Sequence, residues 1–112
     1  MLKELTLSAI TNARERLGER VVTTPSLQWQ GDELSKYLGS DTAVFVKLEL
    51  FQRTGTFKAR GAMNAMLQLT DKQLKRGVTA VSAGNHAIAA AYCAHDLGTH
   101  AKIFMPKTAK PL

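Results

Sequence analysis

Apolar side chains recur every three or four positions in several stretches of this chain, which is the spacing of one face of an α-helix. The first stretch predicts a helix over residues 6–17, with Leu7, Ile10 and Leu17 on its apolar face and Gly18 at its end. Four later stretches predict helices over residues 32–38, 57–69, 71–76 and 85–97. The last of these is rich in alanine, so it can lie close against a neighbouring element.

Three β-branched and apolar runs predict strands over residues 43–50, 78–82 and 101–105. From residue 43 onward the chain therefore alternates strand, helix, strand, helix and strand. This order is typical of an α/β fold, in which crossover helices join the strands of a parallel sheet. Ligands of such sheets bind beyond the carboxyl ends of the strands, where the connecting loops enter the helices.

The composition is that of an ordinary soluble globular protein, with 45% hydrophobic and 21% charged residues in a chain of 112. No apolar run approaches a membrane span, and Glu4 lies where a secretory signal would be apolar, so we expect a cytoplasmic protein without a membrane partner. Because Cys93 is the single cysteine, we expect neither an internal disulfide nor a cysteine-based metal site. His95 and His100 lack partners at metal-ligand spacing, so we expect no metal. The net charge of +6 is spread along the chain, which favours a basic surface over nucleic-acid binding.

The first candidate functional segment precedes the helix predicted over residues 57–69. Gly55 and Thr56 predict a turn and a helix cap, which place Lys58 in the first helical turn. A cation there faces the positive end of the helix dipole, and this field together with partial burial favours the neutral amine. A lysine needs a neutral amine to attack a carbonyl group or to act as a general base. An exposed lysine at a helix start explains the same residues without any function.

The second candidate segment, Ser82-Ala83-Gly84-Asn85-His86, lies between a predicted strand and a predicted helix. Its small residues let the backbone approach a ligand, and free N–H groups at a helix start favour an anion such as a carboxylate. Asn85 is a neutral partner suited to a phenolic oxygen. A simple strand-to-helix turn with Asn85 as the N-cap explains the same residues, and His86 alone is more often a cap or packing residue.

Together, the run Thr-Phe-Lys-Ala-Arg-Gly-Ala at residues 56–62 and the run Ser-Ala-Gly-Asn-His at residues 82–86 resemble the pyridoxal-phosphate enzymes of fold type II. Within that class they are similar to threonine dehydratases (threonine ammonia-lyases), serine dehydratases and serine racemases. The resemblance covers residues 20–109 and includes Thr24-Pro25 and the segment Gln52-Arg53-Thr54-Gly55.

The resemblance implies that Lys58 holds pyridoxal 5'-phosphate covalently and moves protons at the substrate α-carbon. Phe57 would pack against the cofactor ring, and Asn85 would hydrogen-bond the ring oxygen. Ser82, Asn85 and His86, with N–H groups of their loop, would hold the substrate carboxylate. The implied substrate is a small amino acid, and the parent enzyme is implied to be a homo-oligomer. Arg53 and Arg60 could face the anionic cofactor, although a solvated position is the commoner outcome for arginine.

The implied reaction is the conversion of L-threonine or L-serine to a 2-oxo acid and ammonia by β-elimination. Ala83 stands where racemases of this family carry a second serine as an acid–base group, and its lack of a proton to give favours elimination. Ile88 stands where many members have glutamine, which leaves the exact substrate open. Another hydroxyamino-acid lyase, a serine racemase and an inactive fragment remain alternatives, whereas His86 argues against a β-replacement enzyme.

The resemblance also implies an incomplete portion of a two-domain architecture like that of the tryptophan synthase β-subunit. Residues 1–70 would belong to the large cofactor-binding domain, and residues 71–112 would begin the small domain. The glycine-rich loop for the cofactor phosphate would follow beyond Leu112. We therefore expect the 112-residue chain alone to be inactive.

Overall fold

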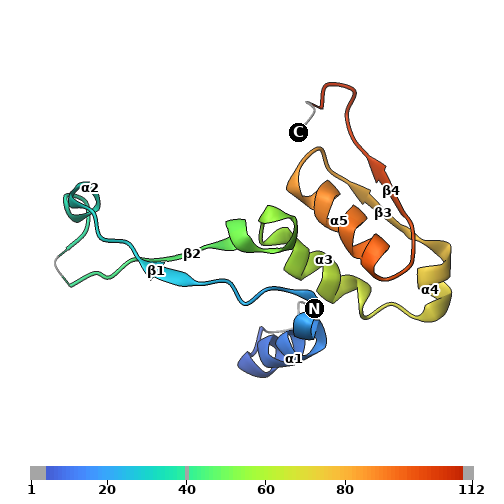
Figure 1. Ribbon diagram of the computed structural model, residues 1–112, viewed down its shortest axis with the longest axis horizontal. Coiled ribbons are helices and arrows are strands. Elements are labelled where there is room, and N and C mark those ends of the chain that lie inside the picture. The colour runs from blue at the N-terminus through green and yellow to red at the C-terminus, as the bar shows by residue number, and fades with distance from the viewer. Residues whose placement is uncertain (1–4, 40, 110–112) are drawn as a thin grey trace.

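A two-stranded arm that carries a short helix at its tip reaches away from the rest of the chain (Figure 1). Its strands, β1 (Ser26–Gln28) and β2 (Phe45–Lys47), pair antiparallel with Leu27 opposite Val46. The tip holds α2 (Asp32–Ser35), which is shorter than the predicted helix over residues 32–38. The computed structural model describes residues 5–39 and 41–109.

The prediction that residues 43–50 form a strand of the parallel sheet is wrong. The strand in this region, β2, has three residues and, within the described part of the chain, pairs only with β1, which the sequence did not predict. The chain then turns into the 3-10 helices η2 (Glu49–Phe51) and η3 (Arg53–Gly55). Alternation of apolar and polar residues indicates an extended chain, but it does not say which strand becomes the partner.

The body of the molecule contains the βαβ unit that the pattern predicts. Strands β3 (Val78–Val81) and β4 (Ala101–Phe104) pair in parallel, and α5 (Asn85–Asp96) crosses over between them. This arrangement confirms the α/β fold class, with two of the three predicted strands in the parallel sheet. Helices α3 (Lys58–Met66) and α4 (Asp71–Arg76) precede the unit, and Thr70 caps α4 in a capping box with Gln73.

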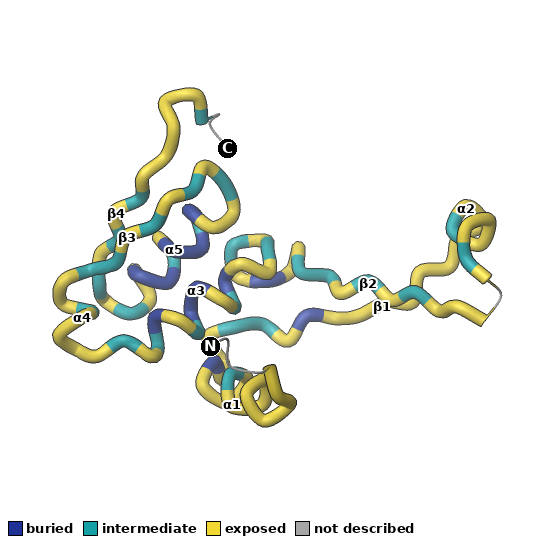
Figure 2. The backbone as a smooth tube through the Cα atoms, turned by 180° about the vertical axis from the view of Figure 1, so that it is seen from behind, coloured by how far each residue is buried: buried dark blue, intermediate teal, exposed yellow. Residues whose placement is uncertain are grey.

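The buried core lies mainly between α3 and α5. It comprises Leu17, Ala62, Met63, Met66, Ala89, Ala90, Cys93 and Ala94. The small alanine side chains of α5 allow this helix to lie close to α3, and Figure 2 shows the buried positions gathered along the two helices. This core joins residues from both sides of residue 70. The division into two domains at that point remains a prediction.

The amino-terminal helix α1 (Leu7–Leu17) is capped by the Thr6 hydroxyl, which accepts a hydrogen bond from Ala9 N (3.2 Å). Its predicted apolar face is only partly covered, since Leu17 is buried whereas Leu7 is 78% exposed and Ile10 52% exposed. The 3-10 helix η1 (Gly18–Arg20) follows it.

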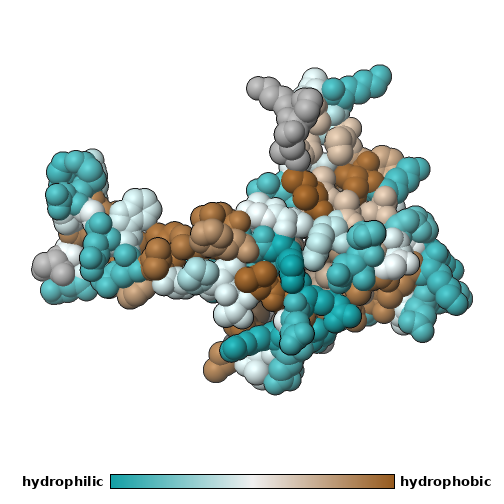
Figure 3. Space-filling model, viewed as in Figure 1, coloured by the Kyte–Doolittle hydropathy of each residue, from teal (hydrophilic) through white to brown (hydrophobic). Residues whose placement is uncertain are grey.

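Apolar surface is also open on the arm and on one face of the small sheet. On the arm, Leu27, Trp29 and Phe45 are each more than half exposed, and apolar side chains cover part of the arm in Figure 3. On the sheet, Val81 and Phe104 are exposed, while Ala80 and Ile103 contact the core. Within residues 5–39 and 41–109, no helix has the length and apolar character needed to cross a membrane.

Candidate active site

Lys58 is the first residue of α3 and so lies in the first helical turn, as the sequence predicts. Its N–H lies within hydrogen-bonding distance of the Thr56 hydroxyl (3.4 Å), and Phe57 occupies the N-cap position. The expected partial burial is not found, because the Lys58 side chain is exposed. Its Nζ lies 5.2 Å from the centre of the Phe57 ring, which is itself 59% exposed. The two side chains predicted to meet the cofactor are therefore adjacent and accessible.

The turn that leads into Lys58 is strained. Thr54 has φ 67° and ψ 11°, and Gly55 has φ 68°, so two successive residues are in the left-handed region. A β-branched residue rarely adopts this conformation. The buried Thr54 hydroxyl also has no hydrogen-bond partner in the described part of the chain. Such outliers concentrate at functional sites and persist only where the surrounding structure holds them.

Gln52 attaches the beginning of this turn to the segment that follows η1. Its side-chain Oε1 accepts from Val22 N (2.9 Å), and its Nε2 donates to Val22 O (2.8 Å). The same Oε1 accepts from Arg53 N (2.9 Å), and Gln52 O accepts from Gly55 N (2.8 Å). Gln52 is only 4% exposed, so its side-chain amide, in place of water, satisfies the hydrogen-bonding groups of the Val22 backbone.

Arg60 attaches the helix start to the same segment through an ion pair that sequence inspection missed. Its Nε donates to Glu49 Oε2 (2.9 Å), and its Nη2 donates to Glu49 Oε1 (2.7 Å). Thr24 Oγ1 also donates to Glu49 Oε1 (2.5 Å), and Arg60 Nη2 reaches Val22 O (3.1 Å). Arg60 is therefore neither fully solvated nor free to face a cofactor. The only sequence signal was the opposite charge of two residues eleven positions apart.

The ion pair with Arg60 stabilises the charged form of Glu49. The hydrogen bond from Arg60 lowers the pKa of the Glu49 carboxyl to about 2, with help from the Thr24 hydroxyl and the charges of Arg60 and Lys47. Burial acts in the opposite direction but does not overcome these contacts. Glu49 is thus ionised throughout the neutral pH range, and the same contact raises the pKa of Arg60.

The second candidate segment forms the turn between β3 and α5. Ser82 extends the pairing of β3, since its N–H donates to Phe104 O (3.0 Å), and its Oγ accepts from Gly84 N (3.2 Å). Gly84 is the N-cap of α5 and Asn85 is the first helical residue, so the alternative in which Asn85 caps the helix is wrong. The side chains of Asn85 and His86 are exposed.

Packing of α3 against α5 connects the two candidate segments. Cys93 on α5 contacts the carbonyl of Ala59, and His86 lines a hollow of about 210 Å³ together with Ala62 and Ala90. Lys58 Nζ makes no hydrogen bond with Ser82, Asn85 or His86, all of which lie in the described ranges. The structure thus places Lys58 beside Phe57 at the start of α3. Ser82 lies in the turn before α5, Asn85 and His86 are its first two residues, and α3 and α5 share one core.

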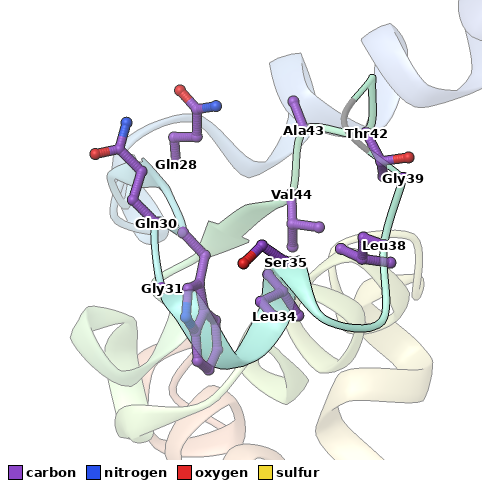
Figure 4. A pocket seen from close by; sticks show the side chains of 11 residues that line it. Gln28, Gln30, Gly31, Leu34, Ser35, Leu38, Gly39, Thr42, Ala43 and Val44 are labelled. Atoms are coloured by element: carbon purple, nitrogen blue, oxygen red, sulfur yellow. The ribbon is translucent and has the colours of Figure 1, made fainter.

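The donor set fits pyridoxal phosphate. An exposed lysine amine suits covalent attachment to its aldehyde, the neighbouring aromatic ring suits contact with the pyridine ring, and the exposed Asn85 amide suits its phenolic oxygen. A separate hollow of about 350 Å³ lies at the tip of the arm, where Leu34, Leu38 and Val44 form part of its wall (Figure 4). None of the candidate site residues lines that hollow.

Comparison with known proteins agrees with this fit. Residues 19–112 match the family of pyridoxal-phosphate dependent enzymes, and the chain belongs to this family. More particularly, its relatives include dehydratases. It is 51% identical to the phenylserine dehydratase of Ralstonia pickettii over 105 residues, which are 94% of this chain and 31% of that enzyme. It is 40% identical to the catabolic L-threonine dehydratase TdcB of Escherichia coli strain K12, over 89% of this chain and 29% of that enzyme.

Solved structures of related enzymes have a similar fold. The structure of maize serine racemase superimposes with a TM-score of 0.77 at 35% sequence identity, covering 91% of this chain and 31% of the racemase. These matches confirm the resemblance to fold type II enzymes that the motifs indicate, and with it pyridoxal phosphate as the cofactor of the family. The chain spans about a third of the length of these relatives.

Proposed function

We propose that this chain forms part of a pyridoxal-phosphate dependent ammonia-lyase, which converts L-threonine or L-serine to a 2-oxo acid and ammonia by β-elimination. The observation that carries the proposal is the position of Lys58, whose exposed amine lies at a helix start and 5.2 Å from the Phe57 ring. The 40% identity with the L-threonine dehydratase TdcB supports the choice of substrate.

The candidate residues contact either the cofactor or the substrate carboxylate in this function, and Asn85 contacts both. Pyridoxal phosphate, when bound, supplies an electron sink for the negative charge that develops at the substrate α-carbon. Lys58 would hold the cofactor covalently until the substrate amine takes its place, and the amine freed in this way would then remove the α-proton. Phe57 packs against the cofactor ring, and Asn85 donates a hydrogen bond to its phenolic oxygen. Ser82, Asn85 and His86, with the N–H groups at the start of α5, bind the substrate carboxylate.

A phenylserine, which carries an aromatic ring on the β-carbon, is the second candidate substrate. The 51% identity with the phenylserine dehydratase of Ralstonia pickettii favours it. Ile88 is half-buried in the first turns of α5, where an apolar side chain is compatible with an apolar substrate. The chemistry at the α-carbon is the same for both candidates, so they differ only in the group on the β-carbon that the site must accommodate.

The test of the lysine uses the full-length protein that contains this chain. Borohydride reduction with bound cofactor, followed by digestion and mass spectrometry, should find the pyridoxyl group on Lys58. Lys58→Ala should lower ammonia release from threonine by at least about a thousandfold, because the covalent anchor and the base are lost together. Lys72→Ala, which changes an exposed lysine of α4, is the matched control and should leave the rate unchanged.

Two results would contradict the proposal. A pyridoxyl group on a different lysine would remove Lys58 from its role. Absence of ammonia release from threonine, serine and phenylserine alike would exclude the ammonia-lyase reaction. A comparison of kcat/KM for these three substrates decides between the two candidate substrate classes.

A further inference from the structure

The strained turn before Lys58 is attached at both ends to one segment of the chain. On one side, Gln52 pairs with both backbone groups of Val22. On the other side, Arg60 pairs with Glu49 and reaches Val22 O and the Thr24 hydroxyl (3.1 and 3.3 Å). Thr54 and Gly55, the two left-handed residues, lie between these attachments.

A β-branched residue in the left-handed region is strained, so the turn needs interactions that hold it in place. The pair of Glu49 and Arg60 is suited to this task because it is bidentate and largely shielded from water. The Glu49 side chain is 16% exposed and that of Arg60 32%. Removal of either partner leaves a charge poorly solvated, which costs more than the loss of an exposed ion pair.

Arg60 and Lys58 do not compete for the same contacts. Arg60 is directed at Glu49 and Thr24, whereas Lys58 lies over the exposed ring of Phe57. Because both residues belong to the first turn of α3, an interaction that fixes one of them also fixes the backbone of the other. The amine of Lys58 remains exposed while its backbone is held.

From this arrangement we propose that Arg60 is a positioning residue, which acts through Glu49 to hold the Thr54–Gly55 turn and the helix start that carries Lys58. The inference rests on the proposed function, in which Lys58 is the cofactor lysine. It adds a requirement for an arginine that contacts neither substrate nor cofactor.

The test compares four variants of the full-length protein: Arg60→Gln, Arg60→Lys, Glu49→Gln and Arg16→Gln. Arg16 is the matched control, because it also donates to α3, at Asn64 Oδ1 (2.6 Å), but farther along the helix and without a carboxylate partner among residues 5–39 and 41–109. The first measurement is hydrogen exchange of the cofactor-free protein, followed by mass spectrometry over residues 53–58. The second is the dissociation constant of pyridoxal phosphate, from its absorbance change, with borohydride trapping to identify the labelled lysine.

Arg60→Gln and Glu49→Gln should speed exchange over residues 53–58 and weaken cofactor binding by about tenfold, the loss expected for one charge-assisted contact. Arg60→Lys keeps the charge but not the bidentate geometry, so it should recover part of the affinity. Arg16→Gln should leave both measurements within about twofold of the wild type.

Unchanged exchange and affinity in Arg60→Gln would overturn the positioning role. Equal acceleration of exchange in α5 and the parallel sheet would also overturn it, because Arg60 would then stabilise the whole fold. If Arg60→Gln does not fold, Glu49→Gln and Arg60→Lys decide by the same criteria. A wild-type protein whose label sits on another lysine refutes the proposed function itself. If Lys58 carries the label but Arg60→Gln changes neither the hydrogen exchange nor the cofactor affinity, only the present inference is refuted.

Discussion

The sulfur of Cys93, on α5, lies 3.8 Å from the main-chain carbonyl oxygen of Ala59, the residue that follows the proposed cofactor lysine. Both residues are almost fully buried, at 0% and 1% exposure. The thiol donates to that carbonyl across the contact between the two core helices. The helix that begins with Asn85 is therefore attached directly to the first turn of the helix that begins with Lys58.

Cys93 is expected to be chemically inert in the folded chain. Burial raises the pKa of its thiol to about 11, and the nearby charge of Asp96 adds to this effect. At pH 8 the reactive thiolate is therefore scarce and inaccessible. Iodoacetamide should modify Cys93 slowly in buffer and rapidly in urea, as followed by mass spectrometry. Rapid modification of the native protein would mean that the contact between α5 and Ala59 opens readily.

Glu49 should make the stability of the chain depend on acidic pH. Because its pKa is about 2 in the folded state against 4.5 as the ordinary value, its contribution is fully present above pH 4.5 and is lost as pH falls towards 2. The contribution should be about 2 kcal/mol at neutral pH. Urea denaturation at pH 7 and pH 3 should show a smaller pH dependence for Glu49→Gln than for the wild type. Glu33→Gln, whose side chain is 83% exposed, is the control and should behave like the wild type.

The contact between α3 and α5 predicts different outcomes for a buried and an exposed alanine of α5. Ala89 is 0% exposed in the core, so Ala89→Leu should lower the free energy of unfolding by about 1–3 kcal/mol through overpacking. Ala91 is exposed on the same helix, and Ala91→Leu should change it by less than about 0.5 kcal/mol. Chemical denaturation of both variants measures the difference. Equal effects would contradict the packing of α5 described above.

Ala83 is expected to suppress racemisation. It is exposed in the turn between β3 and α5, and its methyl group has no proton to give to the substrate. The full-length protein should convert L-serine to a 2-oxo acid with little D-serine. Ala83→Ser should raise the share of D-serine, because it adds a hydroxyl where related racemases have one. Chiral chromatography of the products provides the measurement, and D-serine as the main product of the natural enzyme would contradict the prediction.

The 112-residue chain by itself should self-associate and bind pyridoxal phosphate weakly. Val81 is 80% exposed and Phe104 48% exposed on the same face of a two-stranded sheet, which has unpaired edges. Sedimentation should show an average mass that rises with concentration. Val81→Thr combined with Phe104→Thr should reduce this rise, because the double substitution removes apolar surface and leaves the net charge unchanged. A strictly monomeric chain that binds the cofactor tightly and releases ammonia would contradict this expectation.

The sequence by itself determined the features that depend on neighbouring residues. The periodicity of residues 78–105 predicted β3, α5 and β4 in order, because helix and strand periods are set by local geometry. The caps and glycines predicted Lys58 at a helix start, and the two motifs indicated the family. These signals all lie within a few residues of the features that they predict.

Only the tertiary structure decided which distant segments meet. It gave β2 an antiparallel partner, β1, instead of a place in the parallel sheet. It also paired Arg60 with Glu49 and left Lys58 exposed, although both are basic residues of the same helical turn. The residue type shows that a cation needs either solvent or an anionic partner, but it does not show which of the two surrounds the side chain in the folded chain. That choice depends on how the whole chain is packed, so the support around the candidate site became visible only in three dimensions.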